Sequence, residues 1–198
     1  MRRLILWSGG VESTSLLKQY LSETRDEIFA HYIRMNNPEG RKASELKSIE
    51  TLFPMLNAIR GFNLSFTDLS ICNGKALPND IKVMGPIGVI AMEYHKCEVM
   101  MTSFSTEDYY ARSFLDGVSI TLPRESPDDR FIFKQRRKLI MAVSGRDEDV
   151  YPYHPSFDWP KKKHIEYLGD LFQYTHSCRR PMNGVECGKC HSCIERND

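Results

Sequence analysis

The sequence contains no apolar run that approaches the ~20 residues needed for a membrane-spanning helix. Its charges almost balance, with 27 Lys and Arg against 26 Asp and Glu, so the net charge of +1 gives no global attraction to nucleic acid or to an acidic membrane. Internal repeats and low-complexity tracts are also absent. Only four apolar residues follow Met1-Arg2-Arg3, too few for the core of a signal peptide. We therefore expect a cytoplasmic protein with no membrane contact, and the charge balance argues against nucleic acid as a partner.

Two common nucleotide-binding patterns are missing from the glycine-containing stretch near the N-terminus. A Walker A loop requires Gly-Lys-Ser or Gly-Lys-Thr after four spacer residues, and no lysine stands there. The dinucleotide fingerprint Gly-x-Gly-x-x-Gly does not occur there either. These two absences exclude a Walker-type phosphate clamp and a Rossmann-type dinucleotide loop at this position.

The stretch does contain an apolar run, 4–7, followed by Ser8-Gly9-Gly10 and by several hydroxyl residues. The run predicts a strand covered on both faces, and the glycines allow a sharp turn close to a ligand. Ser13-Thr14-Ser15 is expected at the start of a helix, with its hydroxyls capping that helix. Free N–H groups and the positive end of a helix dipole suit an anion, above all a phosphate. The alternative is an ordinary strand-turn-helix corner.

Further along the chain, patterns typical of strands alternate with patterns typical of helices. Strands are expected at 4–7, 28–35, 62–69 and 99–102, and helices at 14–25, 43–56, 87–94, 133–143 and 159–172. This alternation favours a parallel, doubly wound sheet. The 198 residues suffice for one such core with a small appendage.

Several segments allow two interpretations. Residues 103–130 have no clear period and follow the expected fourth strand, so they form either a wall of the substrate site or a solvated loop. The polar stretch 72–80 is expected to be a loop. The helix expected at 133–143 is basic, and we interpret its basic face as solvated surface rather than as an RNA-binding site. Lys161-Lys162-Lys163 lies near the start of the last helix, an unfavourable place for cations, which either a nearby anion or plain surface charge would explain.

The last 21 residues hold four of the six cysteines, spaced Cys-x8-Cys-x2-Cys-x2-Cys: Cys178, Cys187, Cys190 and Cys193. Thiolates separated by two residues can hold one tetrahedral Zn²⁺, and four protein ligands leave no open position. A structural zinc is therefore predicted, with an iron–sulfur cluster or sulfur-transferring thiols as alternatives. Asn183-Gly184 is expected to form the intervening turn, and Gly188 to permit the knuckle. The other cysteines are interpreted as ordinary thiols and two histidines as bystanders: Cys72, Cys97, His176 and His191.

The N-terminal loop resembles the Ser-Gly-Gly-x-Asp-Ser pyrophosphate loop of the ATP pyrophosphatase superfamily, with Glu12 in place of the aspartate. With the tail included, which reads Thr-His-Ser-Cys from Thr175 and Cys-Gly-Lys-Cys-His-Ser-Cys-Ile-Glu-Arg from Cys187, the chain resembles the 7-cyano-7-deazaguanine synthase family. Weaker matches lie at 29–32 and 101–103. Lys161 aligns with the lysine of the family's Leu-x-Lys-x-Glu motif.

This resemblance implies an α/β fold with a doubly wound, mostly parallel sheet of the adenine nucleotide α-hydrolase type and a C-terminal zinc-binding segment. It places an ATP-pyrophosphatase-like domain at 1–172 and a four-cysteine zinc-binding tail, packed on it, at 173–198. The implied ATP-binding residues are Ser8, Gly9, Gly10, Val11, Glu12, Ser13 and Thr14. The implied catalytic residues are Ser8, Glu12, Ser13 and Lys161.

The family's activity implies ATP with Mg²⁺, a 7-deazapurine substrate and ammonia. Its enzymes adenylate the carboxylate of 7-carboxy-7-deazaguanine, convert it to the amide with ammonia, and use a second ATP to dehydrate the amide to the nitrile. A carboxylate is a poor electrophile until its oxygen becomes a phosphate leaving group, so the site must bind triphosphate, orient the acid and exclude water. A queuosine-type pathway follows from the resemblance, and a homodimer is left open.

The chain departs from the family pattern at three places. Glu12 replaces the loop aspartate, Met84-Gly85-Pro86-Ile87-Gly88 stands where the family has Pro-Gly-Arg-Asn, and Lys163 stands where the Leu-x-Lys-x-Glu glutamate would fall. A divergent relative in a phage or defence context, making a different deazapurine product or conjugate, is therefore an alternative. A tRNA-thiolation enzyme is a second, and a non-catalytic zinc-knuckle binding module a third.

Overall fold

The computed structural model describes residues 1–36, 40–70, 81–103, 113–115, 118–120, 137–146, 149–152 and 154–197. Its centre is a four-stranded sheet of order β3-β2-β1-β4, in which every pairing is parallel. The strands are β1 (Arg2–Leu6), β2 (Glu27–Asn36), β3 (Asn63–Ser70) and β4 (Val99–Met101). β1 lies between β2 and β4, with Leu6 opposite His31 and Ile5 opposite Met101. The expectation of a parallel, doubly wound sheet is confirmed.

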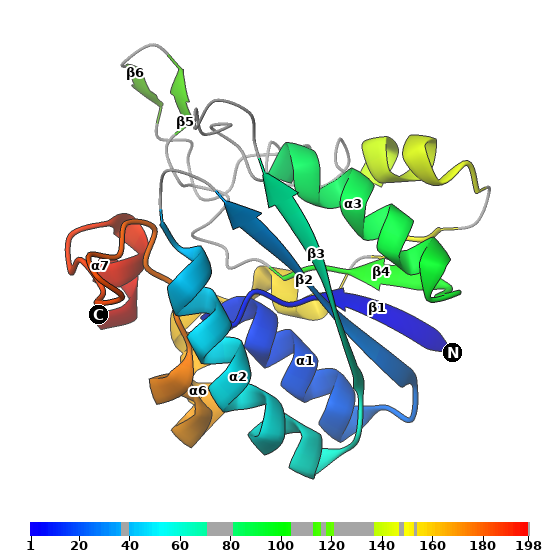
Figure 1. Cartoon of the computed structure of the whole chain (residues 1–198), viewed down its shortest axis with the longest axis horizontal. Helices are drawn as coiled ribbons and strands as arrows, with labels where there is room; N and C mark the ends of the chain where they lie inside the picture. Colours follow the sequence, from blue (N-terminus) through cyan, green and yellow to red (C-terminus); the bar gives the residue numbers. More distant parts are fainter. Residues whose placement is uncertain are drawn as a thin grey trace.

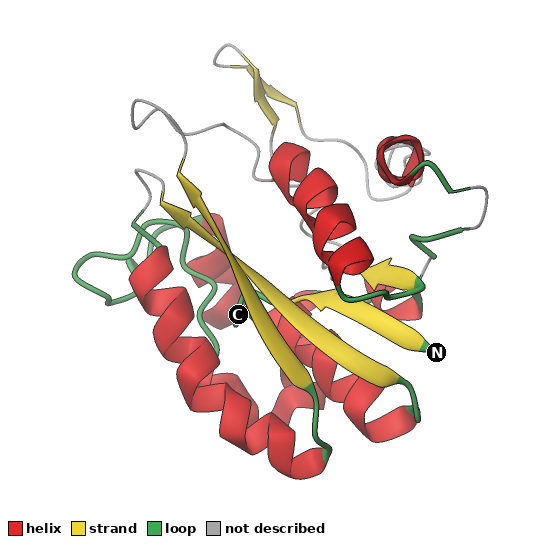
Figure 2. Ribbon diagram, turned by 45° about the vertical axis from the view of Figure 1, so that its right-hand side comes forward, coloured by secondary structure: helices red, strands yellow, loops and turns green. Residues whose placement is uncertain are grey.

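Helices cover both faces of this sheet (Figures 1 and 2). On one face, α1 (Val11–Glu23) and α2 (Lys42–Ile59) bury Leu16 and Leu52 against Trp7 and Tyr32. On the other face, α3 (Ile81–Tyr94) and the helical residues 137–144 pack on the side chains that alternate with these along the strands. Because both faces are covered, β1 reads as a continuous apolar run rather than an alternating one.

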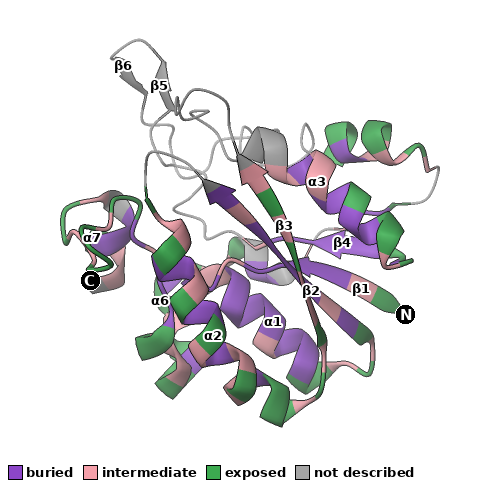
Figure 3. Ribbon diagram, in the orientation of Figure 1, coloured by how far each residue is buried: buried purple, intermediate pink, exposed green. Residues whose placement is uncertain are grey.

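The central position of β1 and α1 is visible in their burial (Figure 3). Leu4, Ile5 and Leu16 are fully buried, and Trp7 is 1% exposed. The polypeptide that joins β1 to α1 is therefore fixed at both ends by well-packed elements. Such a connection can hold a defined geometry without much support from its own side chains.

The C-terminal part consists of short helices. The 3-10 helix η2 (Pro155–Asp158) leads to α6 (Lys161–Leu168), the 3-10 helix η3 (Gly169–Tyr174) and finally α7 (His191–Asn197). α6 packs against α1, where Lys18 Nζ donates hydrogen bonds to the carbonyls of Tyr167 and Leu168 at 2.6 and 3.2 Å. A cation near the last carbonyls of a helix is favourable.

Three expectations about element bounds are wrong. α1 begins at Val11 rather than near residue 14, and α3 begins at Ile81 rather than 87. The helix expected over 159–172 is instead α6 followed by η3, with Gly169 between them at φ +58°. The segment without a clear period contains a small antiparallel pair, β5 (Ser113–Leu115) with β6 (Val118–Ile120).

Some expectations fall on residues outside the described ranges. These are the loop expected over 72–80, most of the candidate substrate wall at 103–130, and the basic residues Lys134 and Arg136. Arg137, which is described, pairs with Asp149 at 2.6 Å. Within the described ranges, no helix combines the length and the apolar character required to cross a bilayer.

Candidate functional site

The loop between β1 and α1 brings Ser8 and Ser13 together, as the sequence predicts. Their Oγ atoms are 3.2 Å apart, and the Ser8 backbone N–H donates to Ser13 Oγ at 3.3 Å. Ser8 Oγ also accepts a hydrogen bond from the Gly10 N–H at 3.4 Å. Two hydroxyls and the first N–H groups of a helix therefore meet at the carboxyl end of a central strand, where open α/β sheets bind their ligands.

Gly9 sets the direction of this loop. Its φ is +72°, a conformation that residues with a Cβ rarely adopt. A Cβ at Gly9 would also lie 2.9 Å from Ser48 Cβ and 3.2 Å from the Glu45 carbonyl oxygen, so α2 packs directly against the loop. Glycine is needed here for two reasons, the backbone conformation and the lack of space.

The hydroxyl residues of α1 do not cap the helix, and that expectation is wrong. The N-cap is Gly10, and no side-chain cap hydrogen bond is present there. Ser13 Oγ donates instead to the Gly10 carbonyl at 3.3 Å, and Thr14 Oγ1 accepts from Trp7 Nε1 at 3.0 Å. Thr14 is fully buried, and its hydroxyl joins α1 to the end of β1 through Trp7.

Glu12 is the acidic residue of the loop, and its partner is Lys161 at the start of α6. The Lys161 Nζ lies 3.1 Å from Glu12 Oε1 and 3.3 Å from Glu195 Oε2 on α7. The lysine side chain is 3% exposed, and the two carboxylates are 13% and 11% exposed. A buried ammonium requires compensation by nearby carboxylates. Lys161 is therefore neither plain surface charge nor evidence of a bound anion, because two carboxylates of the chain itself balance its ammonium.

The segment just before the cysteine cluster docks on the same loop. The His176 N–H donates to the Gly9 carbonyl at 3.0 Å, and the Val11 N–H donates to Ser177 Oγ at 3.3 Å. Arg196 Nη1 donates to Thr175 Oγ1 at 2.9 Å, and its Nη2 donates to the Phe172 carbonyl at 3.1 Å. These bonds fix the segment against the loop from both sides.

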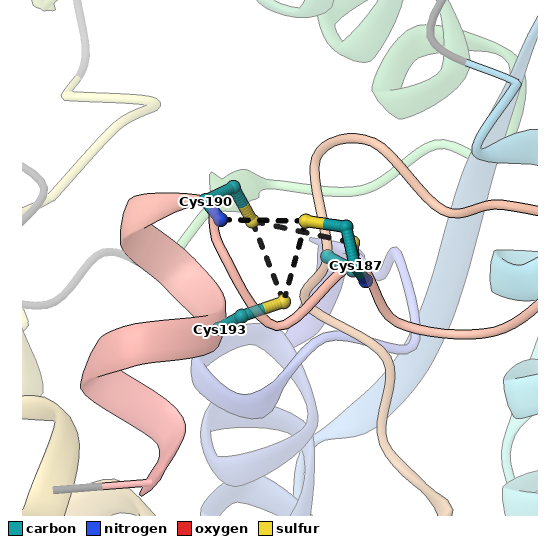
Figure 4. Close-up of side chains that lie close together, drawn as sticks. Cys187, Cys190 and Cys193 are labelled. Atoms are coloured by element: carbon teal, nitrogen blue, oxygen red, sulfur yellow. Dashed lines mark hydrogen bonds between the residues drawn. The ribbon is translucent and has the colours of Figure 1, made fainter.

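The four predicted metal ligands converge on one point. The ligand atoms of Cys178, Cys187, Cys190 and Cys193 all lie within 4.8 Å of one another. Three of these residues are seen in Figure 4, where Cys190 and Cys193 lie at the start of α7 and Cys187 on the preceding loop. None of the four forms a disulfide. The cluster is therefore a candidate metal centre made entirely of thiol groups.

Backbone N–H groups surround these sulfurs. Cys178 Sγ accepts from the N–H of Cys187 at 3.2 Å, and Cys187 Sγ accepts from that of Cys190 at 3.3 Å. Such donors favour thiolates, and the N–H groups of Lys189 and Cys190 lower the pKa of Cys187 to about 6. Burial raises the pKa of Cys178 and Cys193, which a bound cation would offset.

The expected turn elements are present between the ligands. Met182 and Val185 exchange two backbone hydrogen bonds around Asn183-Gly184, whose φ values are both positive. Gly188 has φ +65° between two ligands. Buried His176 lies with its Nδ1 3.7 Å from Glu186 Oε1, and its ring is outside the metal cluster.

Three contributors to the site could not be seen from sequence spacing. Glu195 and Ser177 lie within the tail motif, but their contacts join segments that are 34 and 166 residues apart, with Lys161 and Val11, which spacing does not show. The third is Glu45 at the start of α2, which accepts from Tyr32 Oη at 2.7 Å and pairs with Arg41 at 3.5 Å. Glu45 is recognised as a contributor only in the structure, because it is 8% exposed, which is unusual for a glutamate, and lies on the helix that contacts Gly9.

The contact between Gly9 and α2 can be measured with a pair of alanine variants. Gly40 also has a positive φ, +68°, but a Cβ there would meet nothing within 4 Å. We expect Gly40→Ala to cost about 1 kcal/mol from backbone strain alone. Gly9→Ala should cost at least ~1–2 kcal/mol more, because the methyl group must displace α2. Urea denaturation of both variants checks this, and equal costs would contradict the steric role of α2.

The buried pairing of Lys161 predicts a large effect of removing its charge. Lys161→Met should lower the free energy of unfolding by about 3 kcal/mol or more, since two buried carboxylates lose the cation between them. Lys162→Met on the same helical turn is the control, because Lys162 is exposed and should change stability by less than ~0.5 kcal/mol. Thermal melts that coincide for the two variants would argue against the pairing.

Comparison with solved structures supports the fold. A U34-tRNA thiolase, NcsA from Methanococcus maripaludis with its [4Fe-4S] cluster, matches all of this chain and 64% of its own length with a TM-score of 0.58. The two sequences are only 11% identical, so the likeness extends to the fold alone.

Comparison of sequences identifies closer relatives. A 7-cyano-7-deazaguanine synthase of Rickettsia massiliae is 28% identical over 221 residues, and that of Rickettsia peacockii is 29% identical over 220. Each alignment covers the whole chain and 92% of the relative. The synthase of Leptospira biflexa is 40% identical, but over 58 residues that cover 28% of this chain and 23% of its own. The family model described as "Queuosine biosynthesis protein QueC" matches residues 2–198, and the chain therefore belongs to the QueC family.

Proposed function

We propose that this chain is an ATP-dependent carbon–nitrogen ligase that converts 7-carboxy-7-deazaguanine to 7-cyano-7-deazaguanine with ammonia. The observation that carries the proposal is the Ser8–Ser13 hydroxyl pair at the start of α1, in a chain related over its whole length to synthases of this name. The N–H groups at the start of a helix and its dipole favour phosphate. The loop therefore suits the pyrophosphate that leaves when ATP adenylates a carboxylate.

The proposed reaction proceeds through two activations. The substrate carboxylate attacks the α-phosphate of ATP, releases pyrophosphate and forms an acyl-adenylate. Ammonia displaces AMP and leaves the amide. The amide oxygen then attacks the α-phosphate of a second ATP and releases pyrophosphate. The oxygen leaves as part of AMP, the nitrogen loses two protons, and the nitrile remains. In each of the two activations, an oxygen that is a poor leaving group becomes part of AMP, a good leaving group, and ATP supplies this change.

Within this proposal, Ser8, Gly9, Gly10, Val11 and Ser13 contact the phosphates, and Glu12 assists Mg²⁺ that accompanies ATP. Lys161 holds Glu12 in place through their 3.1 Å contact. Because a second carboxylate, Glu195, shares the same ammonium, Lys161 is better suited to fixing Glu12 than to neutralising phosphate. Thr14 supports the loop through its bond with Trp7.

We infer that residues 173–198 form a zinc-binding tail on the α/β domain of residues 1–172. Four thiolates at ~2.3 Å from one tetrahedral zinc would be about 3.8 Å apart. The sulfur separations Cys187–Cys193 and Cys190–Cys178 are 4.0 Å, and Cys190–Cys193 is 3.4 Å. A four-iron cluster is larger than a single ion and would need its ligands further apart. The sulfur spacing thus favours zinc over the cluster of the thiolase.

The second candidate is a divergent relative that uses the same activation on another acid or acceptor. Glu12 supports this alternative, because it replaces the aspartate that the resemblance implies and pairs with Lys161 at the start of α6. Lys163 supports it as well, standing where the family motif has a glutamate. Both candidates require ATP, and they differ in the acid that is activated or in what receives the activated acyl group.

The proposed function predicts AMP and pyrophosphate from ATP, Mg²⁺, ammonium and 7-carboxy-7-deazaguanine, with the nitrile identified by mass spectrometry. The double variant Ser8→Ala, Ser13→Ala should lose AMP formation by at least about a hundredfold, since it removes both loop hydroxyls. Ser144→Ala deletes a hydroxyl on the other face of the sheet from α1, and its rate of AMP formation should match that of the parent. A double variant that keeps the parental rate would disprove the loop assignment, whereas AMP without nitrile would favour the divergent relative.

The metal assignment predicts one zinc per chain by elemental analysis. Cys190→Ser should lose the zinc and much of the stability of the tail, because metal-driven folding of such segments contributes roughly 10 kcal/mol in small peptides. Cys97→Ala is the matched control, since Cys97 is buried outside the cluster and its variant should keep the zinc. Iron in the purified protein would instead support the iron–sulfur alternative.

A further inference from the structure

Ser177 makes an unusual contact with the phosphate loop. The Val11 N–H, the first of α1, donates to Ser177 Oγ at 3.3 Å across 166 residues of sequence. α1 has Gly10 at its N-cap and no capping side chain of its own there. A hydroxyl from the far end of the chain therefore accepts a hydrogen bond from the first N–H of the helix, one of the four N–H groups that have no partner within a helix.

The chain on both sides of Ser177 is firmly held. His176 donates its N–H to the Gly9 carbonyl at 3.0 Å, and Cys178, which follows, is 1% exposed within the sulfur cluster. A Cβ on Gly10 would lie 3.5 Å from the His176 carbonyl oxygen and 3.8 Å from Ser177 Oγ. Gly10 therefore lies directly under the segment that carries Ser177.

Ser177 combines this position with partial exposure and hydrogen-bonding capacity. The residue is half-buried, unlike the neighbours on either side, which are buried. A serine hydroxyl can accept one hydrogen bond and still donate its own proton. Within the described part of the chain, the contact with Val11 is its one hydrogen bond, so the O–H is left to donate.

Resting on the proposed function, we propose that Ser177 is a phosphate-binding residue of the nucleotide site. The Val11 N–H holds its oxygen, and its O–H donates to an oxygen of the bound pyrophosphate group. The Ser177 hydroxyl thus joins those of Ser8 and Ser13, and the pyrophosphate receives hydrogen bonds both from the loop and from the tail. The site then includes a residue of the metal-binding tail, adjacent in sequence to a predicted metal ligand.

Binding measurements on the full chain test this assignment. Isothermal titration would use three probes: α,β-methylene-ATP with Mg²⁺, inorganic pyrophosphate, and adenosine, which has no phosphate. Ser177→Ala should weaken binding of the first two about tenfold, the usual effect of losing a hydrogen bond to a charged group, and leave adenosine unchanged. Metal content should stay at the parental value.

The pair Ser177→Thr and Ser177→Val is the matched control, because the two variants have the same shape and differ in the hydroxyl. We expect the threonine variant to bind pyrophosphate like the parent and the valine variant to bind about tenfold more weakly. Equal affinities in the pair would reduce Ser177 to a helix cap and overturn the proposal. Tighter binding by the valine variant would also overturn it, since the hydroxyl would then compete with phosphate. A parent chain that binds none of the probes would instead refute the nucleotide function itself.

Discussion

The ammonium group of Lys161 is the charge on which the loop and the tail both depend. It stands at the start of α6, where the helix dipole disfavours a cation, and its side chain is 3% exposed. Only paired carboxylates make such burial tolerable. Glu12 comes from the beginning of the chain and Glu195 from its end, so movement of either segment would uncover a buried charge. This pairing links the two parts of the chain more specifically than apolar packing could.

The tail is consequently joined to the loop between β1 and α1 by several polar contacts. It supplies Glu195 to the buried charges, the His176 N–H to the loop carbonyl and the Ser177 hydroxyl to the first N–H of α1. A segment with so few apolar residues has little core of its own, so its order depends on the sulfur cluster. Whatever holds the four sulfurs together thereby also supports the contacts of His176 and Ser177 with the loop between β1 and α1.

Periodicity predicted the order and type of the central strands and helices, because apolar residues follow each element's own geometry. Each error in the predicted helix bounds has a physical cause in the structure. Ser13-Thr14-Ser15 looks like a capping segment, but the positive φ of Gly9 turns the chain earlier and places these hydroxyls inside the helix. Gly85 and Pro86 are residues that usually interrupt helices, yet α3 extends back through both of them. Gly85 packs there closely against Ile140. Packing between elements decides such cases, and a single sequence does not contain it.

The residues of the candidate site likewise divide into those that the sequence predicts and those that only the structure shows. The four cysteines were predictable because ligand spacing is a property of one short segment, as was the Ser8-Gly9-Gly10 loop. The contacts of Glu195 with Lys161 and of Ser177 with Val11 were not, because they form only when separate segments of the chain meet. Glu12 shows how the two kinds of information combine. The resemblance to the pyrophosphate loop implies an aspartate at this position, whereas the structure gives Glu12 a 3.1 Å contact with Lys161. An aspartate would withdraw the carboxylate by one methylene from that ammonium, so the longer side chain suits a loop whose charge is shared with the tail.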